Sequence, residues 1–443
     1  MNKYLQGSLW LPVVVLSIAC GSAEPSGDDD TSMNPGMFPN GAGGASSNPP
    51  NQLPGNNPPA SGAGGTEGTG TVPLDTNMNP PVTGNGGSTG ATPGTGGTAG
   101  DNPPPATGGT GGTPNMPIPT PTNELYVGEN GVDTNPGTID RPLATLNRAQ
   151  LFARPGFTIW VLPGTLRYSV TQLLSVSGAQ GNLANLFAAP GARPVLEFAG
   201  QPRQDDGARG INLTGSFWHI RGLEIRNAGD NGMAISGSNN TIENLILHNN
   251  GDTGLQITAP EAQATDDARA ANNLILNCDS FANFDPANNG ENADGFAAKL
   301  RVGPGNIFRG CRAWNNADDG WDFFASDDVV TIEDSWAFLN GIIAGGGNSA
   351  GDGNGFKLGG APNGAGQGHA PHVVRGGSAF GNRTCGFTIN NNDETPVLSN
   401  CGIGDNNDDY CGLDCNGEFD VAISGAQAIT RPRNADGSLP SLR

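Results

Sequence analysis

The chain has 443 residues, of which 71 are Gly and 35 are Pro, and its formal net charge at pH 7 is −21. Such an acidic surface repels polyanions, which argues against nucleic acid as a partner. An acidic polymer can still bind where a divalent cation bridges it to the protein. Lysine is scarce and occurs only at Lys3, Lys299 and Lys357.

The first twenty residues have the pattern of a bacterial export signal. A basic start precedes an apolar run from Leu9 to Ile18, and Ala19-Cys20 follows. We therefore predict a signal peptide over residues 1–20, with Cys20 lipidated in a lipoprotein of the outer membrane or cell surface. Ser17 stands where such signals usually have Leu, and the alternative is cleavage after Ala19, which releases a soluble secreted protein. No other apolar run is long enough to cross a bilayer.

The rest of the chain divides by composition into two parts. Residues 21–122 are rich in Gly, Pro, Thr, Asn and Ser and include tracts such as GGTGGT. A segment of this composition cannot bury an apolar core, so we predict a disordered linker. Residues 123–443 are numerous enough for one domain with a large core.

A repeating pattern dominates this last part of the chain. Short segments each end in Asn, and a Gly followed by an apolar residue comes after most of them. Gly232 and Gly254 are 22 residues apart, and this period between Asn- and Gly-rich turns predicts an all-β parallel β-helix. The recurring Asn side chains are expected to stack as a ladder of amides. The segments are 245–250, 278–283, 311–316, 335–340, 377–382 and 401–406, and later Gly positions are Gly295, Gly320, Gly355 and Gly386.

Two further features complete the expected architecture. Residues 143–153 have helical spacing, so we expect a helix that caps the open N-terminal end of the coil. The distance from the ladder Asn to the next Gly is four residues after Asn250, twelve after Asn283 and fifteen after Asn340. Long loops on a solenoid usually build the binding face, so function is expected beside the strands that follow these two loops.

Side-chain alternation places residues of successive coils in columns. If Phe296, Trp321 and Phe356 face the core, the residues after them face outward, about 4.8 Å apart per coil. The outward column is Ala297, Asp322 and Lys357.

Four aspartates, including Asp322 of this column, are expected to converge at the junction of two neighbouring coils: Asp294, Asp318, Asp319 and Asp322. Carboxylates this close repel one another and raise one another's pKa values, and a hard cation relieves the repulsion. Ligand sets made only of oxygen suit Ca²⁺, so the cluster predicts a calcium site. The alternative is that these residues only form turns, as Asp-Gly pairs often do.

The cysteines after position 20 favour disulfides over a metal site. Their spacing matches no zinc motif, and an exported protein can form disulfides. Their pairing stays open at this point. Cys385, Cys401, Cys411 and Cys415 are candidates to staple the last coils, whereas Cys278 and Cys311 are candidates for stacked core thiols.

Three runs of the sequence resemble the pectate lyases of polysaccharide lyase family 9: residues 292–300, 310–322 and 353–359. The resemblance extends over about residues 124–406 and implies a right-handed parallel β-helix. It also implies Ca²⁺ bound by the four aspartates, with Lys357 as general base of a β-elimination on polygalacturonate that leaves 4,5-unsaturated products. The linker and the tail after Asn406 depart from the family pattern, and some relatives act on other polymers.

The resemblance therefore predicts a polysaccharide lyase whose partner is an acidic polysaccharide, pectate. We expect the enzyme to act as a monomer. Lys299 lies two positions beyond the outward column on its strand and is predicted to bind substrate. Endo or exo cleavage, the tolerated methyl esterification and the choice among uronans stay open.

Two other functions are compatible with a β-helix. An inverting glycoside hydrolase could use Asp318 and Asp319, but His369 and the other histidines do not follow the required strands. A non-catalytic polysaccharide-binding surface protein would have no need of an outward Lys357 beside an acidic cluster. Product analysis separates these possibilities, because only a lyase leaves an unsaturated end that absorbs ultraviolet light.

Overall fold

The computed structural model describes residues 123–203, 207–259, 269–343, 347–360 and 369–443, all within one compact unit, Pro105–Arg443. The predicted signal peptide with Cys20 and the predicted linker over residues 21–122 lie outside the described residues. Within the described ranges, no helix has both the length and the apolar character to span a membrane.

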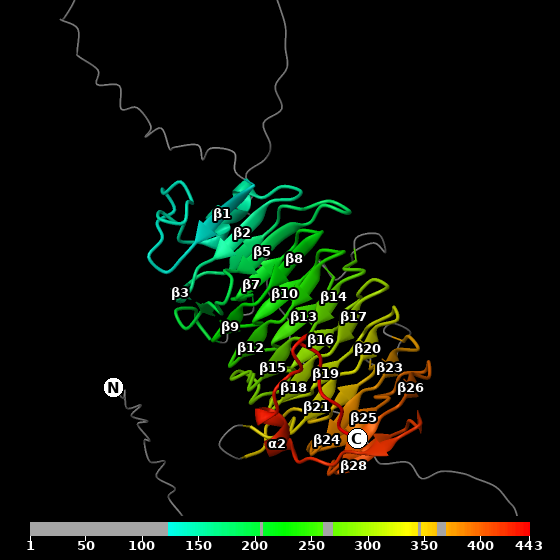
Figure 1. Cartoon of the computed structure of the whole chain (residues 1–443). Coiled ribbons are helices and arrows are strands. Elements are labelled where there is room, and N and C mark those ends of the chain that lie inside the picture. Colours follow the sequence, from blue (N-terminus) through cyan, green and yellow to red (C-terminus); the bar gives the residue numbers. More distant parts are fainter. Residues whose placement is uncertain (1–122, 204–206, 260–268, 344–346, 361–368) are drawn as a thin grey trace, which may run out of the picture. The chain divides into compact units, whose positions relative to one another are not determined.

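Parallel strands of successive coils form three sheets in the described part of the chain (Figure 1). The eleven-stranded sheet contains β1 (Glu124–Val127), β2 (Thr158–Val161), β5 (Ala184–Ala188), β8 (Trp218–Arg221), β11 (Thr241–Glu243), β14 (Leu274–Leu276), β17 (Ile307–Arg309), β20 (Thr331–Glu333), β23 (Val373–Arg375), β26 (Val397–Ser399) and β29 (Cys415–Asn416). The nine-stranded sheet contains β4 (Gln172–Leu174), β7 (Ile211–Leu213), β10 (Met233–Ile235), β13 (Leu255–Ile257), β16 (Phe296–Ala298), β19 (Trp321–Asp322), β22 (Phe356–Lys357), β25 (Cys385–Thr388) and β28 (Asp408–Cys411). The ten-stranded sheet contains β3 (Thr165–Arg167), β6 (Val195–Glu197), β9 (Glu224–Arg226), β12 (Ile246–His248), β15 (Asp279–Phe281), β18 (Arg312–Trp314), β21 (Trp336–Phe338), β24 (Ser378–Phe380), β27 (Gly402–Gly404) and β30 (Phe419–Asp420).

Aromatic rings stack through the core behind the nine-stranded sheet. The ring centroids of Phe296 and Trp321 are 5.0 Å apart, and those of Trp321 and Phe356 are 4.8 Å apart. Phe387 extends the stack at 4.9 Å from Phe356. All four side chains are fully buried. The first three therefore face the core as predicted, and each ring packs one coil onto the next.

The predicted asparagine ladder is confirmed along its whole length. Asn283 Nδ2 donates to Asn316 Oδ1 at 2.9 Å, and Asn316 Nδ2 donates to Asn340 Oδ1 at 3.0 Å. The same bond continues to the end of the coil, from Asn250 to Asn283, from Asn340 to Asn382 and from Asn382 to Asn406.

A second, shorter ladder precedes strands of the eleven-stranded sheet, and the repeat pattern alone did not reveal it. Asn273 Nδ2 donates to Asn306 Oδ1 at 3.0 Å, and the backbone amide of Asn240 donates to Asn273 Oδ1 at 3.1 Å. Because these amides are buried, the ladder satisfies polar groups that would otherwise destabilise the turn.

A short helical segment caps the N-terminal end of the coil. It consists of α1 (Leu146–Ala149) and the 3₁₀ helix η1 (Gln150–Phe152). The side chain of Thr145 accepts a hydrogen bond from the backbone amide of Arg148 and so begins the helix. The predicted cap is thus confirmed, although the helical turns are shorter than residues 143–153.

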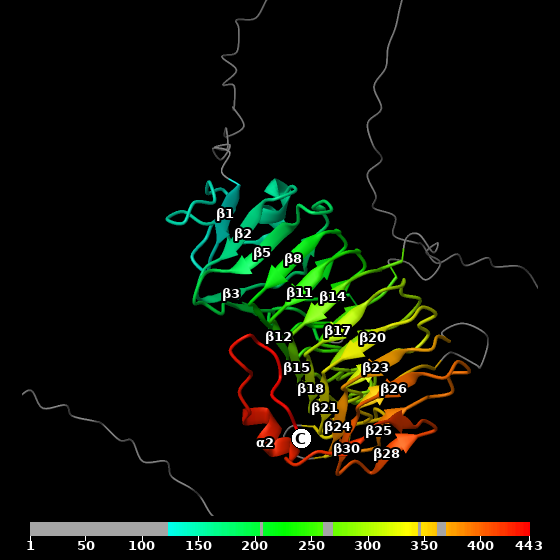
Figure 2. The same cartoon turned by 45° about the vertical axis from the view of Figure 1, so that its right-hand side comes forward.

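The C-terminal tail, residues 425–443, lies against the ten-stranded sheet (Figures 1 and 2). It begins with α2 (Gly425–Thr430). Arg433 of the tail and Arg312 of β18 both bind the carboxylate of Asp279, at 2.5 and 2.7 Å. The tail covers an apolar cluster that comprises Trp314, Trp336, Phe338, Phe380, Ala428 and Leu442.

The cysteines follow the sequence-based prediction. Cys385 pairs with Cys411 and Cys401 pairs with Cys415, so both disulfides staple the last coils. Cys278 and Cys311 are buried free thiols on adjacent coils.

Candidate metal centre and catalytic site

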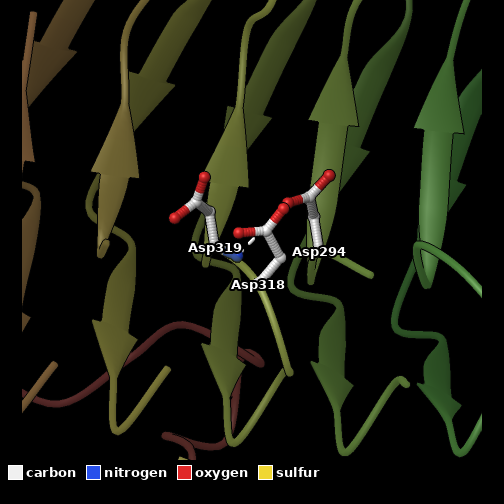
Figure 3. Close-up of side chains that lie close together, drawn as sticks. All are labelled: Asp294, Asp318 and Asp319. Atoms are coloured by element: carbon white, nitrogen blue, oxygen red, sulfur yellow. Dashed lines mark hydrogen bonds between the residues drawn. The ribbon is translucent and has the colours of Figure 1, made fainter. Parts of the chain in front are cut away.

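The nine-stranded sheet carries the predicted constellation. In the strand register, Ala297 lies beside Asp322, and Asp322 lies beside Lys357, which confirms the predicted column. Aspartates in the turns that lead into these strands approach one another (Figure 3). One carboxylate oxygen each from Asp294, Asp318 and Asp319 lies within 4.8 Å of the other two.

Fixed donors orient all three carboxylates, including that of Asp318, which accepts a hydrogen bond from the backbone amide of Asn292 at 3.0 Å. Asp294 Oδ2 accepts a hydrogen bond from Thr253 Oγ1 at 3.1 Å, and Asp294 Oδ1 accepts one from the backbone amide of Asp319 at 3.2 Å. Asp319 Oδ1 accepts two bonds from Asn354, from its backbone amide at 2.7 Å and from Nδ2 at 2.9 Å. Asp319 Oδ2, in contrast, is buried and accepts no well-formed hydrogen bond. The nearest positive group to that oxygen is the ammonium of Lys357, and a cation bound there would compete with this amine.

Two lysines neutralise part of the charge. Lys299 Nζ lies 2.9 Å from Asp294 Oδ2 and 3.3 Å from Asp322 Oδ2. Lys357 Nζ lies 3.2 Å from Asp319 Oδ2 and 4.0 Å from Asp322 Oδ1. Asp322 thus lies between the two ammonium groups and outside the set of three converging oxygens. Its role as a fourth ligand stays a prediction.

Lys299 is nearly buried, whereas a residue that only binds substrate would be expected to face solvent. Its side chain is 11% exposed, and its ammonium group faces the carboxylates. The predicted role in substrate binding is untested, and its observed contacts are those of a counter-ion within the cluster.

Burial dominates the electrostatics of the cluster. It raises the pKa of Asp294 and of Asp319 well above the ordinary carboxyl value, and the charges of Asp322 and Asp318, respectively, raise the two pKa values further. Burial by itself would lower the pKa of Lys357, but nearby carboxylates, led by Asp319, outweigh it and raise that pKa above the ordinary amine value. Burial and mutual repulsion therefore disfavour the ionised form of these carboxyl groups, and a bound cation would favour it.

The donor set fits a hard divalent cation. The converging groups of Asp294, Asp318 and Asp319 are all carboxylate oxygens, which Ca²⁺ prefers, and Ca²⁺ takes about six to eight oxygen ligands. These residues can supply part of that shell, and oxygens of substrate and water would complete it.

Two carboxylates at the site were missed by the sequence-based prediction. Asp352 Oδ2 lies 2.9 Å from Lys357 Nζ. The pKa of Asp252 is raised to about 6, mainly by burial, with Lys299 lowering it and Asp230 raising it. The long insertion after Asn340 was a signal for Asp352. Asp252 occupies the repeat position equivalent to Asp318, two residues before the Gly, and alignment of the repeats could have found it.

The histidines lie away from the carboxylate cluster. His219 and His248 pair with glutamates on the other two sheets. His369 pairs with Asp393, and His372 is buried, where its ring accepts a bond from the backbone of Val330. Among the described residues, the hydrogen-bond and ion-pair partners of these histidines do not include Asp294, Asp318 or Asp319.

Residues 125–418 match the family described as "Pel9A-like, right handed beta helix region". The chain belongs to this family. The predicted right-handed parallel β-helix is thereby confirmed, and the C-terminal tail lies beyond the matched residues.

Several proteins of known name are similar to this chain. One is "Pectate lyase L" of Paenibacillus polymyxa (strain SC2), with 44% identity over 285 residues that cover 62% of this chain and 62% of the relative. Another is "Pectate lyase L" of Dickeya chrysanthemi, with 39% identity over 275 residues, covering 60% of this chain and 61% of the relative. The match thus spans just over three fifths of the length of these curated relatives.

A solved structure agrees with this family membership. The structure titled "Crystal structure of pectate lyase Pel9A" superimposes with a TM-score of 0.61 at 31% sequence identity. The superposition covers 72% of this chain and 87% of that chain.

Proposed function

We propose that the chain is a calcium-dependent pectate lyase that cleaves α-1,4-linked polygalacturonate by β-elimination. One observation carries the proposal: Lys357 Nζ lies 3.2 Å from Asp319, which is one of the three aspartates with converging oxygens. Removal of a proton next to a uronate carboxylate needs a base, and a cation beside that base makes the proton more acidic by neutralising the carboxylate. The names of the relatives, which are pectate lyases, support the same activity.

In the proposed reaction, Lys357 removes the proton from carbon 5 of a galacturonate unit. The electron pair left behind forms the double bond between carbons 4 and 5, and the glycosidic oxygen departs from carbon 4 and takes a proton from solvent. Ca²⁺ held by Asp294, Asp318, Asp319 and Asp322 would neutralise the uronate carboxylate and so increase the acidity of carbon 5. The product carries a 4,5-unsaturated end.

The protonation state of Lys357 decides when it can act. A base must be neutral, and the carboxylates around Lys357 raise its pKa despite its burial. When Asp319 and Asp322 act as metal ligands, their charge no longer holds the proton on Lys357. Metal binding and alkaline pH should therefore favour the active form together.

The two alternatives fit the geometry less well. Inverting hydrolases separate their carboxyl groups by about 6.5–9.5 Å so that a water fits between them. Here, oxygens of Asp318 and Asp319 lie within 4.8 Å. A passive binding surface gives no reason for the nearly buried amine of Lys357 to lie against these carboxylates.

An ultraviolet absorbance assay tests the proposal directly. The purified protein should release unsaturated products from polygalacturonate, lose activity in a chelator and regain it with Ca²⁺. Methyl-esterified pectin, rhamnogalacturonan and alginate provide comparison substrates. Full activity in verified metal-free protein would refute the calcium role, and release of saturated products alone would favour a hydrolase.

We further propose that the protein is exported, that it acts as a monomer and that Cys20 carries a lipid anchor. The sequence pattern of residues 1–20, which predicts an export signal, supports this location. Wild-type protein should fractionate with the outer membrane, and Cys20→Ser should release it into solution. A wholly soluble wild type would instead support cleavage after Ala19.

A further inference from the structure

The fifteen-residue connection from Asn340 to Gly355 brings an additional carboxylate to the site. Its described C-terminal part is held by Arg383, which follows the ladder residue Asn382. The Arg383 guanidinium donates to the carbonyl oxygens of Gly341 and Ser349 at 3.2 and 3.0 Å, and also to the carbonyl of Gly351. One side chain thus anchors both ends of the connection.

The backbone next to the site is fixed against the coil. A Cβ added to Gly351 would lie 2.7 Å from the Cα of Asp318, so only glycine permits this approach. The backbone amide of Asp352 donates to Asp318 Oδ1, and its carbonyl accepts from the hydroxyl of Thr384. These contacts hold the backbone of Asp352 against the coil.

The side chain of Asp352 is in a different situation from its backbone. Its carboxylate lies 2.9 Å from Lys357 Nζ and is 59% exposed. The other carboxylates beside this amine, Asp319 and Asp322, are 0% and 6% exposed. Asp352 is thus the solvent-facing partner of Lys357, and rotation of its side chain alone can open the amine to solvent.

We propose that Asp352 is a specificity-determining gate, whose carboxylate occupies the solvent-facing side of Lys357 until an anionic sugar unit of the polymer replaces it. This inference rests on the proposed function and adds to it a residue that selects for charged substrate. A uronate carboxylate can replace the contact that Asp352 gives up, whereas a neutral sugar cannot. Lys357 keeps its orientation during the exchange, because Asp319 remains 3.2 Å away.

The exchange has a measurable consequence. Asp352→Asn retains the backbone amide that binds Asp318 but removes the competing charge. Exposed ion pairs contribute little, so the KM for polygalacturonate should fall by about two- to fivefold. The kcat should not fall, because the variant keeps Lys357 and the carboxylates that would bind metal, and it removes one of the charges that hold the proton on Lys357.

Asp393→Asn is the matched control. Asp393 is 73% exposed and lies 2.5 Å from His369 Nδ1, so the variant makes the same change in net charge without touching Lys357. Its KM should equal that of the wild type when all three proteins are compared at fixed Ca²⁺ and ionic strength. Calorimetry should give the same Ca²⁺ affinity for all three.

The outcomes separate the two proposals. Suppose that the wild type is active. If Asp352→Asn then has an unchanged or raised KM, or a lower kcat, the gate is overturned and the proposed lyase activity is not. An equal fall of KM in Asp393→Asn also overturns the gate, because general charge repulsion then explains the effect. A wild type inactive on every uronan overturns the proposed function and the gate with it.

Discussion

Lys357 is an amine whose nearest neighbours are carboxylates, which raise its pKa above the ordinary value. If it is the base, the rate should rise with pH into the alkaline range, by about tenfold per pH unit while most of the amine is protonated. Lys357→Ala should lower kcat by about 10²–10⁴-fold, because a positioned base contributes that much. Product absorbance across a pH series measures both effects. A flat pH profile for the wild type would contradict this role.

Lys299 provides the contrasting case, because it shares its ammonium group between Asp294 and Asp322. Lys299→Met leaves Asp294 without its counter-ion, whereas Asp322 keeps Lys357, and breaking a buried ion pair costs about 3–5 kcal/mol. We expect the metal-free variant to melt at a lower temperature than the wild type. Ca²⁺ should bind the variant more tightly, since a competing cation is gone, and should raise its melting temperature more.

Thermal unfolding and calorimetry, each with chelator and with Ca²⁺, measure these changes in Lys299→Met. Lys357→Ala is the comparison variant for activity, because it should abolish turnover that Lys299→Met only reduces. Abolished turnover in Lys299→Met together with retained turnover in Lys357→Ala would show that the base has been misidentified.

The position of a site residue can be predicted from the sequence where that residue belongs to the repeat, because the repeat determines the backbone there. Asp322 and Lys357 lie on adjacent strands and Asp294 lies in the turn before one, so their column positions followed from the repeat alone. Asp352 lies in an insertion with no repeat partner. Its position depends on Arg383, which is distant in sequence, and no local pattern predicts that contact.

The asparagine ladder is the element that joins successive coils. Asn316 is buried, accepts from Asn283 Nδ2 at 2.9 Å and donates to Asn340 Oδ1 at 3.0 Å. Asn316→Ala leaves two buried amides short of a partner, at about 1–3 kcal/mol each. The variant should unfold at lower denaturant concentration than the wild type. Asn407→Ala removes an exposed amide that bonds only to Asp408, and it should leave the transition unchanged.

The short elements at the two ends of the coil differ in how well the sequence predicts them. The N-terminal cap was predicted, because helical spacing and the open core end both point to it. The structure keeps only α1 and η1, since Ala153 already has an extended conformation. α2 was not predicted, because its six residues are too few for a periodic pattern.

At the scale of the whole molecule, the nine-stranded and ten-stranded sheets have different roles. The nine-stranded sheet carries the carboxylates and lysines of the site. The ten-stranded sheet carries an apolar cluster that includes Trp336, Phe338 and Phe380, and residues 425–443 cover it. A solenoid face with exposed aromatic rings is an aggregation hazard, so this tail should contribute to solubility and stability rather than to chemistry.

A chain that ends after Ser424 tests this division. It loses Arg433, while Asp279 keeps its bond to Arg312 at 2.7 Å, so the coil itself should remain folded. The truncated protein should bind a hydrophobic dye through the exposed apolar cluster, melt at a lower temperature than the wild type and aggregate more readily. At moderate temperature, kcat/KM should stay within about twofold of the wild type, because distant sites act independently.

Arg443→Ala is the control. It loses only the contact of its guanidinium with Phe419 at 4.6 Å, and it should show none of these changes. Lost turnover in a truncated chain that is still folded would mean that the tail supports the site through the coil, and the division between the two sheets would then be wrong.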